Sequence, residues 1–367
     1  MFTATGSQSP RKECSTWMID NFDRFGRALT SILRMAPPEL AHDIGLAAME
    51  RGFLKLLPPP APPQLAVPLQ VTIPGLGRLR HPIGLAAGFD KNGRCPAAFE
   101  YMGMSFIELG TVTPRPQPGN PKPRLFRYPE TRSIINRMGF NSEGAEKVLR
   151  RLQELKWNTT RVPLGVNVGK NKNTANEQSI RDFVTGIEAF APLSSWITIN
   201  ISSPNTPGLR SLATPEFLRD LAQSAGDHKK KCWIKLDPDM ERKTFQKLID
   251  VIGGLDVAGV IASNTHRVEW PQAGGQSGYP LLSPANTCLE WIWEVSKGSV
   301  PVIASGGVLS GVDAFHKIAR GASAIQIYTA LVYRGPGAVF RICEELAQEL
   351  KLRGFGSVEE AIGSCYA

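Results

Sequence analysis

The segment at residues 196–210 carries the side chains in this chain that are best suited to chemistry. An apolar, β-branched run ends there in uncharged hydrogen-bonding groups, held by Pro204 and Pro207. The cluster consists of Asn200, Ser202, Ser203, Asn205 and Thr206. Such amides and hydroxyls can hold a planar polar ligand, and a hydroxyl can act as a base without placing a carboxylate beside an anionic substrate. Standing alone, the segment would be interpreted as a loop after a strand.

The segment is one of eight repeats of an apolar strand, a polar or Gly-rich end and a helix. The predicted strands are residues 83–87, 106–110, 164–168, 196–201, 233–236, 259–262, 301–304 and 324–328. Their continuous apolar character indicates parallel strands buried on both faces. Eight such units in ~300 residues predict an α/β fold, the (β/α)8 or TIM barrel. A doubly wound sheet is the alternative, but its early Gly-x-Gly-x-x-Gly turn does not follow the first strand.

In a barrel, the carboxyl ends of the strands form the active site. The residues expected in this ring include Gly88, Lys91, Thr111, Asn167, Lys235, Ser263, Asn264, Thr265, Gly307, Tyr328 and Thr329. Asn136 and Asn141 are placed in a loop after the second strand. Because Glu and His are nearly absent, metal-dependent hydrolysis and paired-carboxylate glycoside chemistry are disfavoured, and no metal site is expected.

Two features of the ring suggest an anionic cofactor. Glycines after strand seven (Gly306, Gly307), together with Gly278 and Tyr328-Thr329, fit the usual phosphate position of barrels. Lys235 lies among apolar neighbours, so its ammonium either reaches solvent or meets an anionic partner, such as a cofactor ring that gains charge on reduction.

An N-terminal appendage precedes the barrel. Residues 1–15 are polar and expected to be frayed, and residues 16–35 form an amphipathic helix with Met18, Phe22, Phe25, Leu29, Ile32 and Leu33 on its apolar face. A second helix is predicted at residues 40–57, so that residues 16–57 form a helical region. The Pro-rich residues 58–65 form a stiff linker to the barrel, residues 66–367, which opens with a hairpin turning at Pro74-Gly75.

Composition excludes several classes of protein. The 367 residues, 42% of them apolar, can bury a full core, and no apolar run is long enough to span a membrane. A formal charge of +9 comes without a long basic block or a nucleic-acid-binding motif, so nucleic acid is not an expected partner. Six scattered cysteines and only five histidines favour a reduced compartment and disfavour a structural zinc site.

Five motifs in order carry a family resemblance. They are Gly-Leu-Ala-Ala-Gly-Phe-Asp-Lys-Asn-Gly at 84–93, Glu-Leu-Gly-Thr-Val-Thr-Pro-Arg-Pro-Gln at 108–117, Ile-Asn-Arg-Met-Gly-Phe-Asn at 135–141, Gly-Val-Asn-Val-Gly-Lys-Asn-Lys at 165–172, and Asn-Ile-Ser-Ser-Pro-Asn-Thr-Pro-Gly-Leu-Arg at 200–210. The chain thereby resembles the class 2, quinone-dependent dihydroorotate dehydrogenases, from about residue 38 to near the C-terminus.

The resemblance implies oxidation of (S)-dihydroorotate to orotate, a step of pyrimidine synthesis, with one FMN as hydride acceptor. It makes Ser203 the base that removes the C5 proton, and Thr206 and Phe140 the residues that shape the proton exit. The implied substrate residues are Lys91, Asn136, Arg137, Met138, Gly139, Phe140, Asn200, Asn205, Asn264 and Thr265. The implied flavin residues are Ala87, Gly88, Lys91, Thr111, Asn167, Asn200, Lys235, Ser263, Gly278, Gly307, Tyr328 and Thr329.

The helical appendage and a serine rather than a cysteine base both point to class 2. In that class two amphipathic helices rest on the membrane and form the mouth of a quinone tunnel. His42 and Arg127 match the positions that approach the quinone head group. We expect a monomer in peripheral contact with a membrane. The cytoplasmic face of a bacterial inner membrane is favoured, with the mitochondrial inner membrane as the alternative.

Other interpretations remain at this stage. One is an FMN barrel of class 1 type that passes electrons to a soluble acceptor, and a more remote one is a non-catalytic barrel that binds ligands. Asp237, His266 and Gln276 depart from the family pattern, and their effect on the substrate lid or the flavin environment is open.

Overall fold

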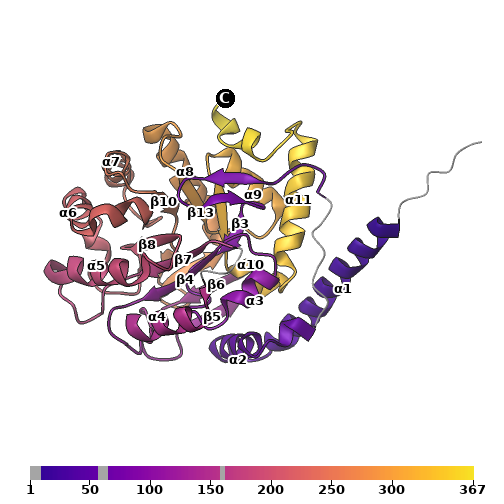
Figure 1. Cartoon of the computed structure of the whole chain (residues 1–367), viewed down its shortest axis with the longest axis horizontal. Coiled ribbons are helices and arrows are strands. Elements are labelled where there is room, and N and C mark those ends of the chain that lie inside the picture. The colour runs from indigo at the N-terminus through magenta and orange to yellow at the C-terminus, as the bar shows by residue number, and fades with distance from the viewer. Residues whose placement is uncertain (1–9, 57–64, 158–161) are drawn as a thin grey trace, which may run out of the picture.

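Eight parallel strands close into a barrel in the computed structural model, which describes residues 10–56, 65–157 and 162–367, with side chains from Phe22 onward (Figure 1). The strands are β3 (Ile83–Leu85), β4 (Ile107–Val112), β7 (Leu164–Val168), β8 (Trp196–Asn200), β9 (Cys232–Lys235), β10 (Gly259–Ala262), β13 (Val302–Ser305) and β14 (Ala324–Ile327). They are hydrogen-bonded in the order β10-β13-β14-β3-β4-β7-β8-β9, and each overlaps one predicted strand. The predicted (β/α)8 barrel is therefore confirmed.

Helices surround this barrel (Figure 1). They are α3 (Pro96–Tyr101), α4 (Ala145–Glu154), α5 (Ser179–Phe190), α6 (Pro215–Ala225), α7 (Arg242–Gly253), α8 (Leu282–Ser296), α9 (Gly311–Ala319), α10 (Thr329–Arg334) and α11 (Ala338–Leu352). Side-chain caps fix two starts: the Thr214 hydroxyl accepts from the Phe217 N–H, and the Ser310 hydroxyl accepts from the Asp313 N–H.

Large aromatic side chains pack inside the barrel between its strands, and glycines make room for them. A Cβ built on Gly165 would lie 1.9 Å from the Trp196 ring, and one on Gly84 would lie 2.5 Å from Phe106. Both rings are completely buried, and their centroids lie 5.9 Å apart. A larger side chain at either glycine would force these rings out of the core.

A second, four-stranded sheet lies at the mouth of the barrel, and the sequence did not predict it. Its strands are β5 (Leu125–Tyr128), β6 (Ser133–Asn136), β11 (His266–Val268) and β12 (Gly274–Gly278), in the antiparallel order β11-β12-β6-β5. The prediction that Asn136 lies in a loop is therefore wrong, because Asn136 ends strand β6. The sheet escaped detection because its strands are short and Gly274–Gly278 reads as a turn. The predicted hairpin is present as β1 (Val71–Ile73) and β2 (Gly77–Leu79).

The N-terminal appendage consists of α1 (Pro10–Leu33), α2 (Pro38–Glu50) and a 3-10 turn, η1 (Phe53–Leu56). Helix α1 begins earlier than the predicted residue 16, and α2 ends earlier than the predicted residue 57. Some of the predicted features lie outside what the structure describes. They are residues 1–9 of the frayed tail, the Met18 side chain and residues 58–64 of the linker.

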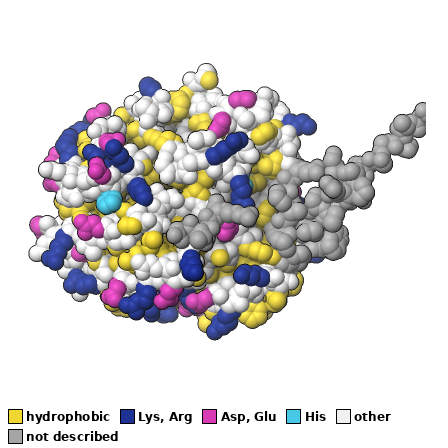
Figure 2. Space-filling model, in the orientation of Figure 1, with side chains coloured by type: hydrophobic (Ala, Val, Ile, Leu, Met, Phe, Trp, Pro, Cys, Tyr) yellow, Lys and Arg dark blue, Asp and Glu magenta, His cyan; other side chains and the backbone are white. Residues whose placement is uncertain are grey.

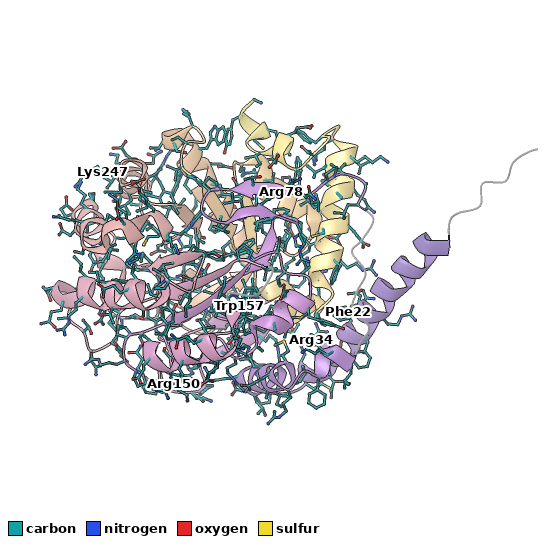
Figure 3. All side chains as sticks on the ribbon, in the orientation of Figure 1. Phe22, Arg34, Arg78, Arg150, Trp157 and Lys247 are labelled. Carbon is teal, nitrogen blue, oxygen red and sulfur yellow. The ribbon has the colours of Figure 1, made fainter. Side chains whose placement is uncertain are left out.

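Helix α1 docks on the barrel through a few buried groups, and Figure 3 shows Phe22 on the part of α1 next to the barrel. The Phe22 ring lies 6.4 Å from Tyr101 and 6.2 Å from Phe340, measured between centroids. Beside it, the buried Asp23 carboxylate pairs with Arg27 at 2.9 Å and with Arg341 at 3.3 Å. These contacts orient α1, while much of its remaining apolar face stays exposed.

Figure 2 shows acidic and basic side chains interspersed over the visible face of the molecule. Within the described ranges, none of the helices combines the length and hydropathy that crossing a membrane requires.

Gly26 provides a test of how α1 is held. A Cβ there would lie 2.5 Å from Pro336 Cγ, so Gly26→Ala should displace α1 from the barrel. We expect trypsin to cleave at Arg24 and Arg27 about tenfold faster, because a released helix opens locally, while the barrel keeps its melting temperature. Gly45→Ala in α2 is the matched control, since its Cβ would meet nothing within 4 Å. Unchanged cleavage of Gly26→Ala would show that this contact does not hold the helix.

Candidate active site

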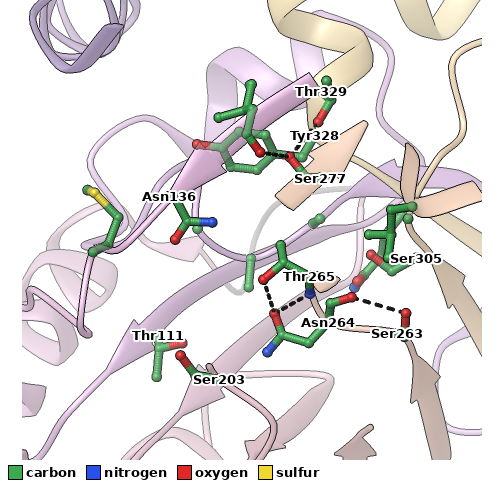
Figure 4. Close-up of a pocket in the computed structure, with 18 of the residues that line it drawn as sticks. Thr111, Asn136, Ser203, Ser263, Asn264, Thr265, Ser277, Ser305, Tyr328 and Thr329 are labelled. Atoms are coloured by element: carbon green, nitrogen blue, oxygen red, sulfur yellow. Dashed lines mark hydrogen bonds between the residues drawn. The ribbon is translucent and has the colours of Figure 1, made fainter. Parts of the chain in front are cut away.

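The carboxyl ends of the barrel strands and the second sheet enclose a cavity of about 1160 Å³, which we call the mouth cavity. Most of the predicted site residues line it. They are Ala87, Gly88, Lys91, Thr111, Asn136, Met138, Gly139, Phe140, Asn200, Ser203, Asn205, Lys235, Ser263, Asn264, Thr265, Gly278, Gly307, Tyr328 and Thr329. In Figure 4, Ser203 and Thr111 lie on one side of this cavity, and Ser277, Tyr328 and Thr329 on the other.

Three of the residues predicted to bind substrate or flavin or to shape the proton exit do not line the mouth cavity. Asn167 is completely buried within β7 and contacts the lining side chains from behind. Thr206 is buried in the loop after β8, where its hydroxyl has no partner among the described residues. The Arg137 guanidinium points elsewhere: it donates to the Pro123 carbonyl at 3.0 Å and stacks on the Phe126 ring.

Sequence reasoning missed several lining residues. Leu125, Ile134 and Ser277 belong to the unpredicted sheet, whereas Leu281 and Val308 are apolar residues that gave no sign of a site. Ser305 and Gln326 were accessible to prediction, because each is a polar residue within or directly after an apolar barrel strand.

A buried hydrogen-bonded network joins the strand ends. The Thr111 hydroxyl donates to Asn167 Oδ1 at 2.6 Å, and Asn200 Nδ2 donates to the same oxygen at 3.0 Å. Asn264 Nδ2 donates to the Ser202 hydroxyl at 2.9 Å. Since the side chains come from different strands, the closed barrel itself holds their geometry.

Ser203 lies in the loop after β8 and is 6% exposed. Its Oγ accepts from the Asn205 backbone N–H at 3.3 Å. The hydroxyl can therefore still donate its own proton to another group. The Asn205 side chain donates to Asn136 Oδ1 at 3.1 Å, and Asn120 donates to the Asn205 carbonyl at 3.2 Å. The loop that carries Ser203 is thus tied to the second sheet and to the loop before it.

Lys91 is one of the two described lysines that line the mouth cavity. The pKa of Lys91 is lowered to about 7, mainly by burial and also by the nearby Arg124 guanidinium, while Glu39 opposes both effects. Its ammonium donates to Asn141 Oδ1. Arg124 itself is paired with Glu39 of α2 at 2.9 Å, so this ion pair links α2 to the region of Lys91.

Lys235, at the end of β9, is 5% exposed and lines the mouth cavity. Its ammonium has neither an ion pair nor a hydrogen bond with any described residue. A buried cation without a partner is costly, so this position favours an anionic or electron-rich ligand over a structural role. Nearby, Gly306 and Gly307 adopt φ of +107° and +82°, and a Cβ on Gly307 would lie 2.3 Å from Leu282 Cα. Only glycine fits there, and its backbone stays open to a ligand.

A second cavity of about 1670 Å³, which we call the helix groove, lies under α1 and α2. Its lining is mostly apolar, and it shares His42, Leu125, Ile134 and Tyr328 with the mouth cavity. Burial lowers the pKa of His42 to about 4, with Lys91 adding to the effect, so the ring is neutral at physiological pH. Arg127 also lines the groove, and it donates to the carbonyls of Arg34 and Ala36 at 2.8 Å, which fixes the turn between α1 and α2.

Asp237, His266 and Gln276, which depart from the family pattern, lie outside the mouth cavity, whereas Ser263, which stands where Thr is common in the family, lines it. Asp237 pairs with Arg210 at 2.7 Å, and burial raises its pKa to about 6. His266 contacts Asp239, which also pairs with Arg210. Gln276 donates to the Ser133 hydroxyl at 3.4 Å. Asp237 and His266 thus join a network at the end of the Ser203 loop.

Fold and site together define a (β/α)8-barrel enzyme with a polar cavity at the carboxyl ends of its strands. The family model for dihydroorotate dehydrogenase matches residues 68–350. The chain belongs to the dihydroorotate dehydrogenase family.

Individual relatives agree with this assignment. The chain is 41% identical to a dihydroorotate dehydrogenase (quinone) of Myxococcus xanthus, over 91% of this chain and 96% of the relative. It is 38% identical to the mitochondrial dihydroorotate dehydrogenase (quinone) of Mus musculus, over 91% and 88%. A crystal structure of DHODH in complex with ferulenol from Eimeria tenella superposes with a TM-score of 0.83 at 35% identity, over 90% and 96% of the two chains.

The pKa of Lys91 predicts how an anion binds in the mouth cavity. Because the ammonium is charged below about pH 7 and neutral above it, orotate should bind more weakly as pH rises through 7, by up to about tenfold per pH unit. Bound orotate would in turn raise this pKa. Titration between pH 6 and 8.5, followed by absorbance or calorimetry, measures the effect. The control Lys172→Met, at an exposed lysine, should show the same dependence of orotate affinity on pH as the wild type. A wild-type affinity that does not change with pH would contradict the role of Lys91 in binding orotate.

Proposed function

We propose that this chain oxidises (S)-dihydroorotate to orotate, with FMN as hydride acceptor and a membrane quinone as final electron acceptor, in pyrimidine synthesis. The observation that carries the proposal is the arrangement of two cavities with a common wall. The mouth cavity holds Ser203, Lys235 and the amides, and the helix groove is apolar and reaches the same His42 and Tyr328.

The residues at the mouth fit FMN. The unpartnered Lys235 ammonium suits the flavin edge that becomes negative on reduction, and the Gly278, Gly307 and Thr329 region suits its phosphate. Ala87, Gly88, Thr111, Asn200, Ser263 and Tyr328 would complete the binding site, supported from behind by Asn167. When bound, FMN supplies the hydride acceptor that no side chain of this protein can replace.

The substrate would lie between the flavin site and the Ser203 loop. Asn136, Asn200, Asn205 and Asn264 can read the polar edge of a pyrimidine, assisted by Thr265. Lys91 would offset its negative charge, and the Met138–Phe140 stretch would close the side of the cavity. The Ser203 hydroxyl removes the C5 proton, a role in which a serine needs an exit for that proton. Thr206, whose buried hydroxyl has no partner among the described residues, and Phe140 would shape that exit.

The helix groove is proposed to take up the quinone. Its apolar lining suits a lipid-soluble molecule, and the neutral His42 ring, with Arg127, suits a polar head group. Phe25, Ile32 and Met35 of the α1 region are 53%, 65% and 87% exposed, and Ile44 of α2 is 46% exposed. Exposed apolar side chains of this density favour peripheral membrane contact. We place the protein, as a monomer, on the cytoplasmic face of a bacterial inner membrane, with the mitochondrial inner membrane as the alternative.

Ser203→Ala tests the proposed base. Flavin reduction by dihydroorotate under anaerobic conditions should slow by about a hundredfold or more, because general-base catalysis commonly contributes that much. FMN content should not change. Ser211→Ala is the matched control: this serine lies on the same connection, donates to the Gly208 carbonyl and does not line the cavity. Near-normal reduction by Ser203→Ala would refute the role of the hydroxyl.

A plug in the helix groove tests the quinone path. Ala48 lines the groove, so Ala48→Trp should reduce quinone turnover by about tenfold or more, through steric exclusion. Flavin reduction by dihydroorotate should remain normal, since the mouth cavity is untouched. Ala47→Trp, one residue away and outside the lining, is the control. If Ala48→Trp, and also removal of residues 1–57, left quinone turnover and membrane binding intact, the groove would not be the quinone site.

A further inference from the structure

Glu108 is a completely buried carboxylate that the proposed function does not use. It lies on β4, and both of its oxygens accept hydrogen bonds from side-chain amides. Asn167 Nδ2 donates to Oε1 at 2.7 Å, and Gln326 Nε2 donates to Oε2. No described Lys, Arg or His forms an ion pair with it. Fully buried carboxylates are rare because burying a charge is unfavourable. The presence of one inside the barrel, with a side-chain amide donating to each oxygen, therefore indicates a role other than packing.

An ionised carboxylate can only accept hydrogen bonds, and this fixes the direction of its neighbours. Asn167 must turn its NH2 group towards Glu108, so its carbonyl oxygen faces Thr111 and Asn200. Asn200 accordingly turns its NH2 group towards Asn167, and its own oxygen accepts from the Ser202 N–H at 3.4 Å and from Asn264 Nδ2 at 3.4 Å. Each amide in the series points its donors towards Glu108.

The second amide bonded to Glu108 is oriented in the same way. Because the NH2 group of Gln326 faces the carboxylate, its Oε1 is directed away. That oxygen is buried without a hydrogen-bond partner among the described residues, and Gln326 lines the mouth cavity. Gln326 therefore keeps an unused acceptor in the wall of the mouth cavity.

We propose that Glu108 is a positioning residue that sets the direction of the hydrogen bonds across the site through Asn167 and Gln326. The inference rests on the proposed function and adds a consequence for the flavin. Glu108 contacts Asn167, which supports the proposed flavin site, and Gln326, which lines the mouth cavity. Its negative charge would disfavour the charge that a bound flavin gains on reduction, so Glu108 would lower the reduction potential and oppose Lys235.

Glu108→Gln tests the proposal, because it keeps the shape, removes the charge and introduces an NH2 group that competes with the donors of Asn167 and Gln326. We expect the dissociation constants of FMN and orotate to rise by about tenfold. The ratio of reduced to oxidised flavin at a given potential should also rise by about tenfold, which is about 30 mV for a two-electron couple. Thr198→Val, at a buried β8 hydroxyl outside this network, should change none of these quantities.

The exchange Glu108→Gln with Gln326→Glu separates direction from packing. A carboxylate at position 326 would accept the NH2 group of the new glutamine, whose oxygen would again accept from Asn167, so the original direction returns. The double variant should bind FMN and orotate within about threefold of the wild type and recover its potential, although each single variant is impaired. If Glu108→Gln does not fold, this double variant remains the decisive protein.

The outcomes are distinguishable. Wild-type ligand affinities and potential in Glu108→Gln, or no rescue by the exchange, would overturn the role of Glu108 while leaving the proposed function intact. Failure of the wild-type protein to take up FMN would instead refute the proposed function, and this inference with it.

Discussion

The site depends on one constraint, which is that polar groups buried inside an apolar barrel must satisfy one another. An unsatisfied buried donor or acceptor costs about 1–3 kcal/mol, so amides from several strands are stable there only as a connected network. Glu108 gives that network a fixed end, since it offers acceptors alone. From it the hydrogen bonds run through Asn167 and Asn200 to the loop that carries Ser203. The hydrogen bonds that join the strand ends of the closed barrel are therefore the same ones that fix the geometry of the site.

Where the network stops, the protein leaves groups for ligands to complete. The Gln326 oxygen and the Thr206 hydroxyl are buried without a partner among the described residues. The Lys235 side chain is nearly buried, and its ammonium lines the mouth cavity without a hydrogen bond to a described residue. The pKa of Lys91 is lowered to about 7, mainly by burial. Such a site is costly when empty and favourable when occupied, so ligands that supply the missing charge and hydrogen bonds also stabilise the fold. The unfavourable free energy of the empty site is offset by apolar packing in the surrounding barrel, in which Phe106, Trp196 and Trp233 are fully buried.

The sequence was sufficient for the barrel and for most of the mouth cavity, because both follow from local patterns. Eight apolar runs predict eight strands, and in a closed parallel barrel the residues that follow each strand lie together at its carboxyl end. The second sheet could not be found this way, since β6 and β12 are distant in sequence and Gly274–Gly278 has no apolar alternation. The direction of the Arg137 side chain could not be predicted for a related reason. Its motif gave the position of the backbone, whereas its side chain turns to Pro123 and Phe126 of the unpredicted region.

The second sheet also explains why the appendage is more than an anchor. Strand β5 contributes Leu125 and β6 contributes Ile134, and these two side chains separate the mouth cavity from the helix groove. Helix α2 is fastened to the same region through Glu39 and Arg124, and Arg127 of β5 fixes the turn before α2. The wall between the proposed flavin and quinone positions is thus one layer of side chains, completed by His42 and Tyr328. Electrons would need to pass only this layer, whereas dihydroorotate, being polar, is kept out of the apolar groove. Because α2 supplies His42 to this wall, a movement of α2 would alter it directly and would couple the proposed membrane contact to the proposed electron path.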